Sequence, residues 1–173
     1  MGLSLGINKP ITCRDIILWR HAEAVDAVDG DDMARALTSK GQRHAKRIAC
    51  WLKQHLPEDT LILSSAALRA FQTAQALNKF NSSKINVYSV LNPDASLQEI
   101  LAFLARFDAK NNLLLVGHQP LLGRLAEHLL ALDMDSINIK KGAIWWLRLE
   151  SNSANLMQPL HYEIVSVQTP SLV

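Results

Sequence analysis

Cysteine is scarce in this chain, and long hydrophobic runs are absent. Only two cysteines, Cys13 and Cys50, occur among 173 residues. Small secreted folds use dense cysteine frameworks, so this pattern favours the reducing environment of the cytoplasm. The first residues lack the cationic start and the apolar run of a signal peptide, and other apolar stretches are too short to span a membrane. We therefore expect a cytoplasmic protein that is not inserted in a membrane.

A surplus of one charge is also absent. The 18 lysines and arginines oppose 16 aspartates and glutamates, which gives a formal net charge of +2, and the basic residues are scattered. Nucleic-acid-binding proteins gather basic residues in a patch or stripe, so nucleic acid is not the expected partner. No repeat or linker divides the chain. At roughly 100–200 residues per domain, the length predicts a single domain over residues 1–173, with residues 1–14 as a leader.

Short apolar segments alternate with amphipathic helical segments along most of the chain. Strands are predicted at residues 15–19, 60–64, 85–88 and 112–116, and helices are predicted to begin near Thr38, Leu68, Ser96 and Pro120. This alternation predicts an α/β fold, a three-layer sandwich with a mostly parallel central sheet and helices on both faces. Two last strands, at residues 143–149 and 162–167, have no helix between them and could form an antiparallel edge.

Polar and basic side chains follow the four predicted parallel strands. They are Arg20 and His21 after the first, Ser64, Ser65 and Arg69 after the second, Asn92, Pro93 and Asp94 after the third, and Gly117, His118 and Gln119 after the fourth. Open α/β sheets bind ligands beyond the carboxyl ends of their strands, so these groups should lie together. Guanidinium and imidazole groups suit a phosphoryl group, and a helix beginning at Arg69 would favour an anion further. A neutral imidazole can also attack phosphorus, so such a site needs no metal.

Four motifs carry a resemblance to a known family. They are LWRHA at residues 18–22, LTSKG at 37–41, SSAALRAFQTA at 64–74 and VGHQP at 116–120. In order and spacing they resemble the R-H-G, L-T-x-x-G, S-S-P-x-x-R-x-x-Q-T-A and second-histidine motifs of the histidine phosphatase superfamily, which has the phosphoglycerate mutase-like fold. The short chain without large insertions looks most like the SixA-type phosphohistidine phosphatases.

The resemblance implies a set of roles and a partner. His21 would be the phosphorylated nucleophile, and Arg20, Arg69 and His118 would bind the phosphate, so all four are candidate catalytic residues. It implies no metal and no cofactor. The implied substrate is a histidine-phosphorylated protein, such as a phosphotransfer or phosphorelay component. The mechanism requires His21 to be neutral and favours a charged His118.

Three features depart from the family pattern. Ala22 stands where glycine is usual and Ala66 where proline is usual, which changes backbone freedom rather than chemistry. No carboxylate stands unambiguously where larger relatives keep a general acid, and Glu23, Asp26 and Asp94 are the nearby candidates. An imidazole leaves phosphorus with less need of a proton than an alkoxide does. A site without a dedicated acid therefore favours cleavage of a P–N bond.

Two other functions stay open at this point. The same site could hydrolyse small phosphomonoesters, with one of the three carboxylates as the acid. It could also belong to a non-catalytic module that binds phosphorylated ligands, against which an intact His21 argues.

The remaining charged and histidine residues are expected at the surface. The acidic loop at residues 26–32 and the pair Lys140 and Lys141 should be solvated, although the loop could rim the site and the lysines could help to dock an acidic partner. No spacing typical of a zinc site is present. Four further histidines are expected to be surface or locally hydrogen-bonded residues: His44, His55, His128 and His161.

Overall fold

The secondary structure follows the predicted alternation. The computed structural model describes residues 10–27, 29–78, 84–133, 135–150 and 161–173, so most of the expected leader lies outside the described residues. In chain order the elements are β1 (Asp15–Arg20), α1 (Ser39–His55), β2 (Leu61–Ser64), α2 (Leu68–Asn78), β3 (Ile85–Val87), η1 (Ser89–Leu91), α3 (Leu97–Leu104), β4 (Asn112–Gly117), α4 (Leu121–Leu130), β5 (Ile144–Leu149) and β6 (Tyr162–Gln168). Each of the six predicted strands agrees with its observed strand to within one residue at either end.

The strands form one mixed sheet in the order β3-β2-β4-β1-β5-β6. The first four of these are parallel, whereas β5 and β6 are antiparallel to their neighbours, as the missing helix between them suggested. The parallel strands end at the same level, because Arg20 of β1 lies opposite Gly117 of β4 and Ser64 of β2 lies opposite Val116. This register brings the residues that follow β1, β2 and β4 to one edge of the sheet.

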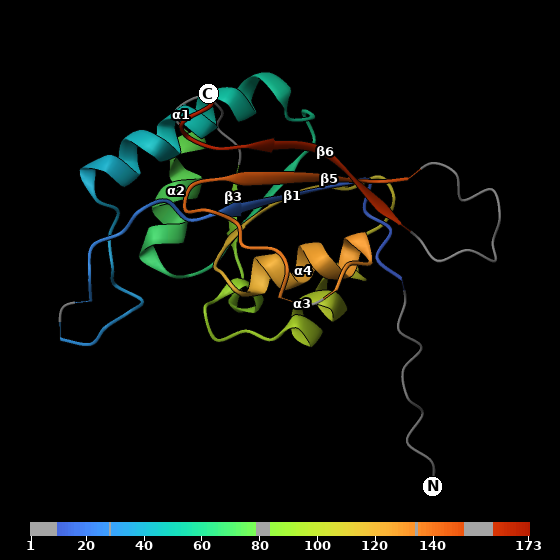
Figure 1. Cartoon of the computed structure of the whole chain (residues 1–173), viewed down its shortest axis with the longest axis horizontal. Coiled ribbons are helices and arrows are strands. Elements are labelled where there is room, and N and C mark those ends of the chain that lie inside the picture. Colours follow the sequence, from blue (N-terminus) through green and yellow to red (C-terminus); the bar gives the residue numbers. More distant parts are fainter. Residues whose placement is uncertain (1–9, 28, 79–83, 134, 151–160) are drawn as a thin grey trace, which may run out of the picture.

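Helices cover both faces of the sheet, which confirms the predicted three-layer α/β architecture. Figure 1 shows α1 and α2 on one face and α3 and α4 on the other. The two faces of β1 illustrate the two cores: Ile16 and Leu18 join the core under α4, whereas Ile17 and Trp19 join the core under α1. Both sides of the strand are buried, which explains why its sequence is continuously apolar rather than alternating.

The segment that follows the third strand differs from its prediction. Asn92 was expected at its end, but β3 ends at Val87 and the short 3-10 helix η1 carries the chain onward. The backbone N–H of Asn92 donates to the carbonyl of Ser89 at 2.9 Å, and that bond closes the turn. Asn92 thus leaves η1 with a fixed backbone and lies beside the residues that follow β2.

The molecular surface matches the remaining expectations. Lys140 and Lys141 are exposed, and the four other histidines are exposed apart from His44, which is half-buried. In the part of the chain that the structure describes, no helix combines the length and the apolar character that crossing a membrane requires. Cys13 is buried in the core and Cys50 is exposed on α1.

Candidate active site

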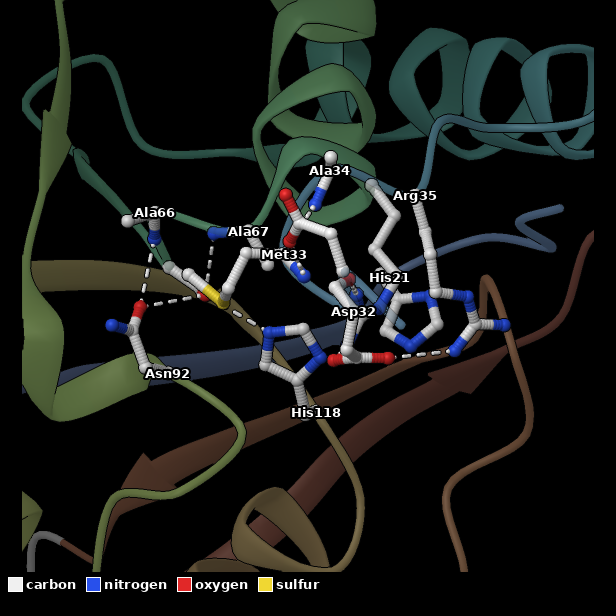
Figure 2. A network of polar contacts seen from close by, with 12 residues as sticks. His21, Asp32, Met33, Ala34, Arg35, Ala66, Ala67, Asn92 and His118 are labelled. Carbon is white, nitrogen blue, oxygen red and sulfur yellow. Dashed lines mark hydrogen bonds and ion pairs between the residues drawn. The ribbon is translucent and has the colours of Figure 1, made fainter. Parts of the chain in front are cut away.

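The four basic residues predicted at the strand ends lie together in the structure. His21 and Arg20 come from the end of β1, His118 follows β4, and Arg69 lies on the first turn of α2. Exposed fractions are only 7% for His21, 4% for Arg69 and 3% for His118. The two imidazole rings have centroids 5.0 Å apart and are tilted by 50°. Figure 2 shows these rings on either side of a polar network.

The hydrogen bonds of His21 determine which of its nitrogens can react. Its Nδ1 atom lies 2.7 Å from the carbonyl oxygen of Ala22, and a carbonyl can only accept, so Nδ1 carries the proton. The Nε2 atom then holds the free lone pair of a neutral ring. Burial, and more weakly the charges of Arg69 and Arg20, lower the pKa of His21 to about 4, although the bond to Ala22 opposes this. At neutral pH the ring is therefore uncharged, and its Nε2 lone pair is chemically able to act as a nucleophile.

His118 is neutral as well, which differs from the expectation of a charged partner. Burial, then repulsion from His21 when that ring is protonated, and then the charge of Arg69 lower the pKa of His118 to about 3. The expectation failed because burial at the end of β4 is invisible in the sequence. A bound phosphoryl group would raise this pKa, because its negative charge would offset the surrounding cations.

In Arg20 and Arg69, some guanidinium nitrogens make hydrogen bonds to the protein, while the Nε atom has no partner among the described residues. Nη1 of Arg20 donates to the carbonyl of Ile139 at 2.7 Å, and Nη2 of Arg69 donates to the Oδ2 atom of Asp32 at 2.7 Å. Six buried side-chain nitrogens or oxygens lack a hydrogen-bond partner among the described residues. Three of the six lie here: Nε of Arg20, Nε of Arg69 and Nδ1 of His118. The two arginine Nε–H groups are buried donors without partners, which is unfavourable, so an anion that binds them would satisfy them with no further desolvation cost.

Asp32 is a site residue that the sequence reasoning missed. The whole loop at residues 26–32 was expected to be solvated, yet the Asp32 carboxylate bridges Arg69 and Arg35, the latter at 2.9 Å. Figure 2 shows this carboxylate between the rings of His118 and His21. Hydrogen bonds from Arg35 and Arg69 lower the pKa of Asp32, so it stays ionised. Its place depends on Arg69, which lies 37 residues away, and no local pattern distinguishes it from the other aspartates of the loop.

Of the three candidate general acids, one is paired with other side chains and two are exposed. Glu23 accepts hydrogen bonds from Lys40 and Thr38, and these bonds lower the pKa of Glu23. Asp26 and Asp94 are exposed. Among the described residues, no hydrogen bond or ion pair joins either of them to the four basic residues. Within the same described part of the chain, no three His, Cys, Asp or Glu side chains are arranged to hold a metal ion.

The other motifs hold the loop that follows His21. Gln72 accepts a hydrogen bond from the backbone N–H of Leu37 at 2.7 Å, and Thr73 accepts one from Ala22 at 3.1 Å. Gly41 packs so closely on the carbonyl of Glu23 that a Cβ atom there would overlap it. The glycine of the second motif is therefore required by this close approach, and α1 and α2 together fix the backbone beside His21.

Comparison with known proteins adds the family context. The model of the histidine phosphatase superfamily (branch 1) matches residues 16–102. An uncharacterised protein from Picosynechococcus sp. is 35% identical over 90% of this chain and 96% of its own length. A phosphohistidine phosphatase SixA homologue from Haemophilus influenzae is 29% identical over 66% of this chain and 76% of its own. A solved structure assigned to phosphohistidine phosphatase SixA from Nakamurella multipartitia has 30% identity and a TM-score of 0.72, covering 93% of this chain and 98% of the other.

Proposed function

This chain belongs to the histidine phosphatase superfamily, among its SixA-type members, and from that premise we propose that it hydrolyses phosphohistidine on proteins. The reaction needs no metal and proceeds through a phosphohistidine formed on His21. The observation that carries this proposal is the pair of buried neutral imidazoles, 5.0 Å apart, flanked by two arginines with unpartnered buried nitrogens. A nucleophile and a cradle for phosphoryl oxygens would thus lie side by side at the carboxyl end of the sheet.

The reaction has two transfers. In the first, the lone pair on Nε2 of His21 attacks phosphorus, the P–N bond of the substrate breaks, and its electrons return to the substrate imidazole. That imidazole leaves neutral when its other nitrogen is protonated. In the second, water attacks the phosphorus held on His21, the electrons of the new P–N bond return to Nε2, and Nδ1 of His118 accepts the water proton. Arg20 and Arg69 bind the phosphoryl oxygens throughout.

The state of the carboxylates supports a P–N substrate over a phosphate ester. Asp32 is ion-paired with Arg69, and Glu23 is paired with Lys40, so both are held in the ionised form. An alkoxide leaving group needs a proton from an acid, whereas an imidazole needs much less help. A site whose nearby carboxylates are ionised therefore suits phosphohistidine better than a phosphomonoester.

The proposed partner is a histidine-phosphorylated protein, such as a phosphotransfer component, in the cytoplasm. Gly142 donates its N–H to the carbonyls of Arg20 and His21 at 3.1 Å, and it directly follows the exposed Lys140 and Lys141. These two cations therefore lie beside the nucleophile, where they would attract an acidic protein surface.

The test compares two substrates in the presence of a chelator. Wild type, His21→Ala and the exposed control His55→Ala are assayed on a histidine-phosphorylated transfer protein and on p-nitrophenyl phosphate. We expect a much higher rate on the phosphoprotein, its loss in His21→Ala alone, and radiolabel trapped on His21 of wild type after rapid quenching. A higher rate on the ester would instead indicate a small-molecule phosphatase. Binding without turnover on either substrate would indicate a non-catalytic module.

A further inference from the structure

Four hydrogen bonds converge on Ser65 and Asn92, beside the second histidine. The Nε2 atom of His118 lies 2.9 Å from Oγ of Ser65, and Oγ of Ser65 lies 3.0 Å from Oδ1 of Asn92. Two backbone groups join them: the N–H of Ala66 donates to Oδ1 of Asn92 at 2.9 Å, and the N–H of Ala67 donates to Oγ of Ser65 at 3.1 Å. Figure 2 shows Asn92, Ala66 and Ala67 on the side of His118 away from His21.

The directions of these bonds follow from the backbone donors. The N–H of Ala66 can only donate, so the atom of Asn92 that faces it is the amide oxygen. That oxygen can only accept, so the hydroxyl hydrogen of Ser65 must point to it. The same hydroxyl accepts from Ala67, and its one remaining lone pair faces His118. The Nε2 atom of His118 must therefore be the donor of the last bond.

We infer that Asn92 and Ser65 are positioning residues that fix neutral His118 as its Nε2–H tautomer. The Nδ1 atom of His118 then bears a free lone pair. It is buried and has no partner among the described residues, and Figure 2 shows the second ring nitrogen turned toward Asp32 and His21. The hydrogen-bonded series Asn92, Ser65 and His118 thus presents a proton acceptor, rather than a donor, to the phosphoryl site. During hydrolysis this atom takes the proton of the attacking water, and it can then donate to an oxygen of the released phosphate.

A departure from the family pattern strengthens this assignment. Ala66 stands where proline is usual in the family motif, and proline has no N–H. The N–H that fixes the orientation of the Asn92 amide exists only because alanine occupies this position. Ser65 is fully buried, and η1 fixes the backbone of Asn92, so both partners are held before a substrate arrives.

The test reads the tautomer directly, by ¹⁵N NMR of the ring nitrogens of His118 at neutral pH, without substrate. Wild type should show a protonated Nε2 and an unprotonated Nδ1. In Asn92→Ala the Ser65 hydroxyl is released and can donate to Nε2, so a mixture of tautomers should appear. Asn92→Asp keeps an acceptor and should restore the wild-type tautomer while its charge raises the pKa of His118. Asn78→Ala, an exposed asparagine on α2, is the control and should match wild type.

Turnover provides a second readout, which rests on the proposed phosphatase function. Asn92→Ala should lower kcat on a phosphoprotein by about tenfold with little change in KM, since binding groups are intact and only proton transfer is disturbed. A wild-type spectrum with protonated Nδ1, or an Asn92→Ala spectrum identical to wild type, would overturn the inference. If the tautomers respond as expected while wild type does not hydrolyse phosphohistidine, the inferred role of Asn92 and Ser65 is upheld and the proposed function fails. Ser65→Ala should give the same mixture of tautomers. Because Ser65 is buried, its replacement can also impair folding for other reasons, so the result for Asn92→Ala is the deciding one.

Discussion

The two ends of the central sheet each hold an arginine paired with an aspartate, but the two pairs have different surroundings. At the amino end, Arg148 makes two bonds to Asp15, at 2.7 and 2.8 Å, and Asp15 is 1% exposed. At the carboxyl end, Arg69 pairs with Asp32, while Arg20, His21 and His118 make no ion pair with a carboxylate among the described residues. The first end is a closed structural pair. The second keeps unpartnered buried nitrogens, which a bound anion would satisfy.

This difference indicates that the ion pair at one end of the sheet chiefly stabilises the fold, whereas the residues at the other end are suited to binding a ligand. A buried carboxylate that loses its cation strongly destabilises a fold, because its charge is left without compensation. A cation whose aspartate partner is half-exposed, as Asp32 is, should contribute less to folding and more to ligand binding. The same residue type therefore has different consequences at the two ends.

The largest expected effect separates Arg69 from Arg148. Arg69→Gln should reduce hydrolysis of phosphohistidine by about 10²- to 10³-fold, because the transition state loses a principal charge partner. Its free energy of unfolding should change by no more than about 1 kcal/mol, because Asp32 is 49% exposed and becomes solvated. Rates and urea denaturation curves, measured on the same preparations, check both statements.

The matched variant at the other end should behave in the opposite way. Arg148→Gln should lower the free energy of unfolding by about 2 kcal/mol, since Asp15 stays buried while the 40% exposed arginine is removed. Its turnover should stay close to wild type. The comparison between the two ends fails if Arg148→Gln loses activity while Arg69→Gln loses stability.

The next effect concerns pH and the buried histidines. Their pKa values in the folded protein, about 4 for His21 and about 3 for His118, lie below the ordinary value of 6.5. Between these pKa values the unfolded chain binds more protons than the folded one. The contribution of the two neutral histidines to stability is therefore fully present above pH 6.5 and is lost as the pH falls toward 4. The shift of His21 alone corresponds to about 3 kcal/mol over that window.

Carboxylates also contribute to acid unfolding, so a difference between variants is the measurement. The change in free energy of unfolding between pH 7 and pH 4.5 should be clearly smaller in His21→Gln/His118→Gln than in wild type. The exposed control His55→Gln should retain the wild-type change. An unaltered pH dependence in the double variant would show that these two rings are not held neutral by the fold.

Much of the fold could be predicted because it depends on local pattern. The apolar runs of β1 and β4, the helix cap at Thr38 and the capping box of Ser96 and Glu99 are set by neighbouring residues. Because ligands bind at the carboxyl ends of parallel strands, the basic residues that follow these strands could be predicted to form one site. Thr38 indeed accepts from the N–H of Gly41 at 2.9 Å, within the motif that the sequence singled out.

The parts that could not be predicted depend on contacts between distant segments. The carbonyl of Ile139 anchors Arg20 across 119 residues, and Asn92 meets Ala66 across 26. A backbone carbonyl carries no sequence signature, and an asparagine after η1 looks like an ordinary turn residue. The protonation of His118 also could not be predicted, because it depends on burial and on the nearby His21 and Arg69, which come from distant segments.

The smallest expected effect concerns Asp32, the one carboxylate in contact with Arg69. Its negative charge competes with phosphate for the Nη2 atom of Arg69, so Asp32→Asn should bind inorganic phosphate about fivefold more tightly, or about 1 kcal/mol. The asparagine oxygen still accepts from Arg69, so the arginine keeps its orientation. The dissociation constant can be followed through the ring signals of His118 at neutral pH and low ionic strength.

Asp29→Asn is the matched control for this change. It removes the same charge from the same loop, but Asp29 is exposed and has no hydrogen bond to Arg69 among the described residues. If general electrostatics alone governed affinity, the two variants would tighten phosphate binding equally. A larger gain in Asp32→Asn would show that the pair at the carboxyl end, unlike Asp15 and Arg148, is one that substrate must displace. A loss of affinity in Asp32→Asn would show instead that Asp32 chiefly holds Arg69 in place, and the two ends of the sheet would then be more alike than their geometry indicates.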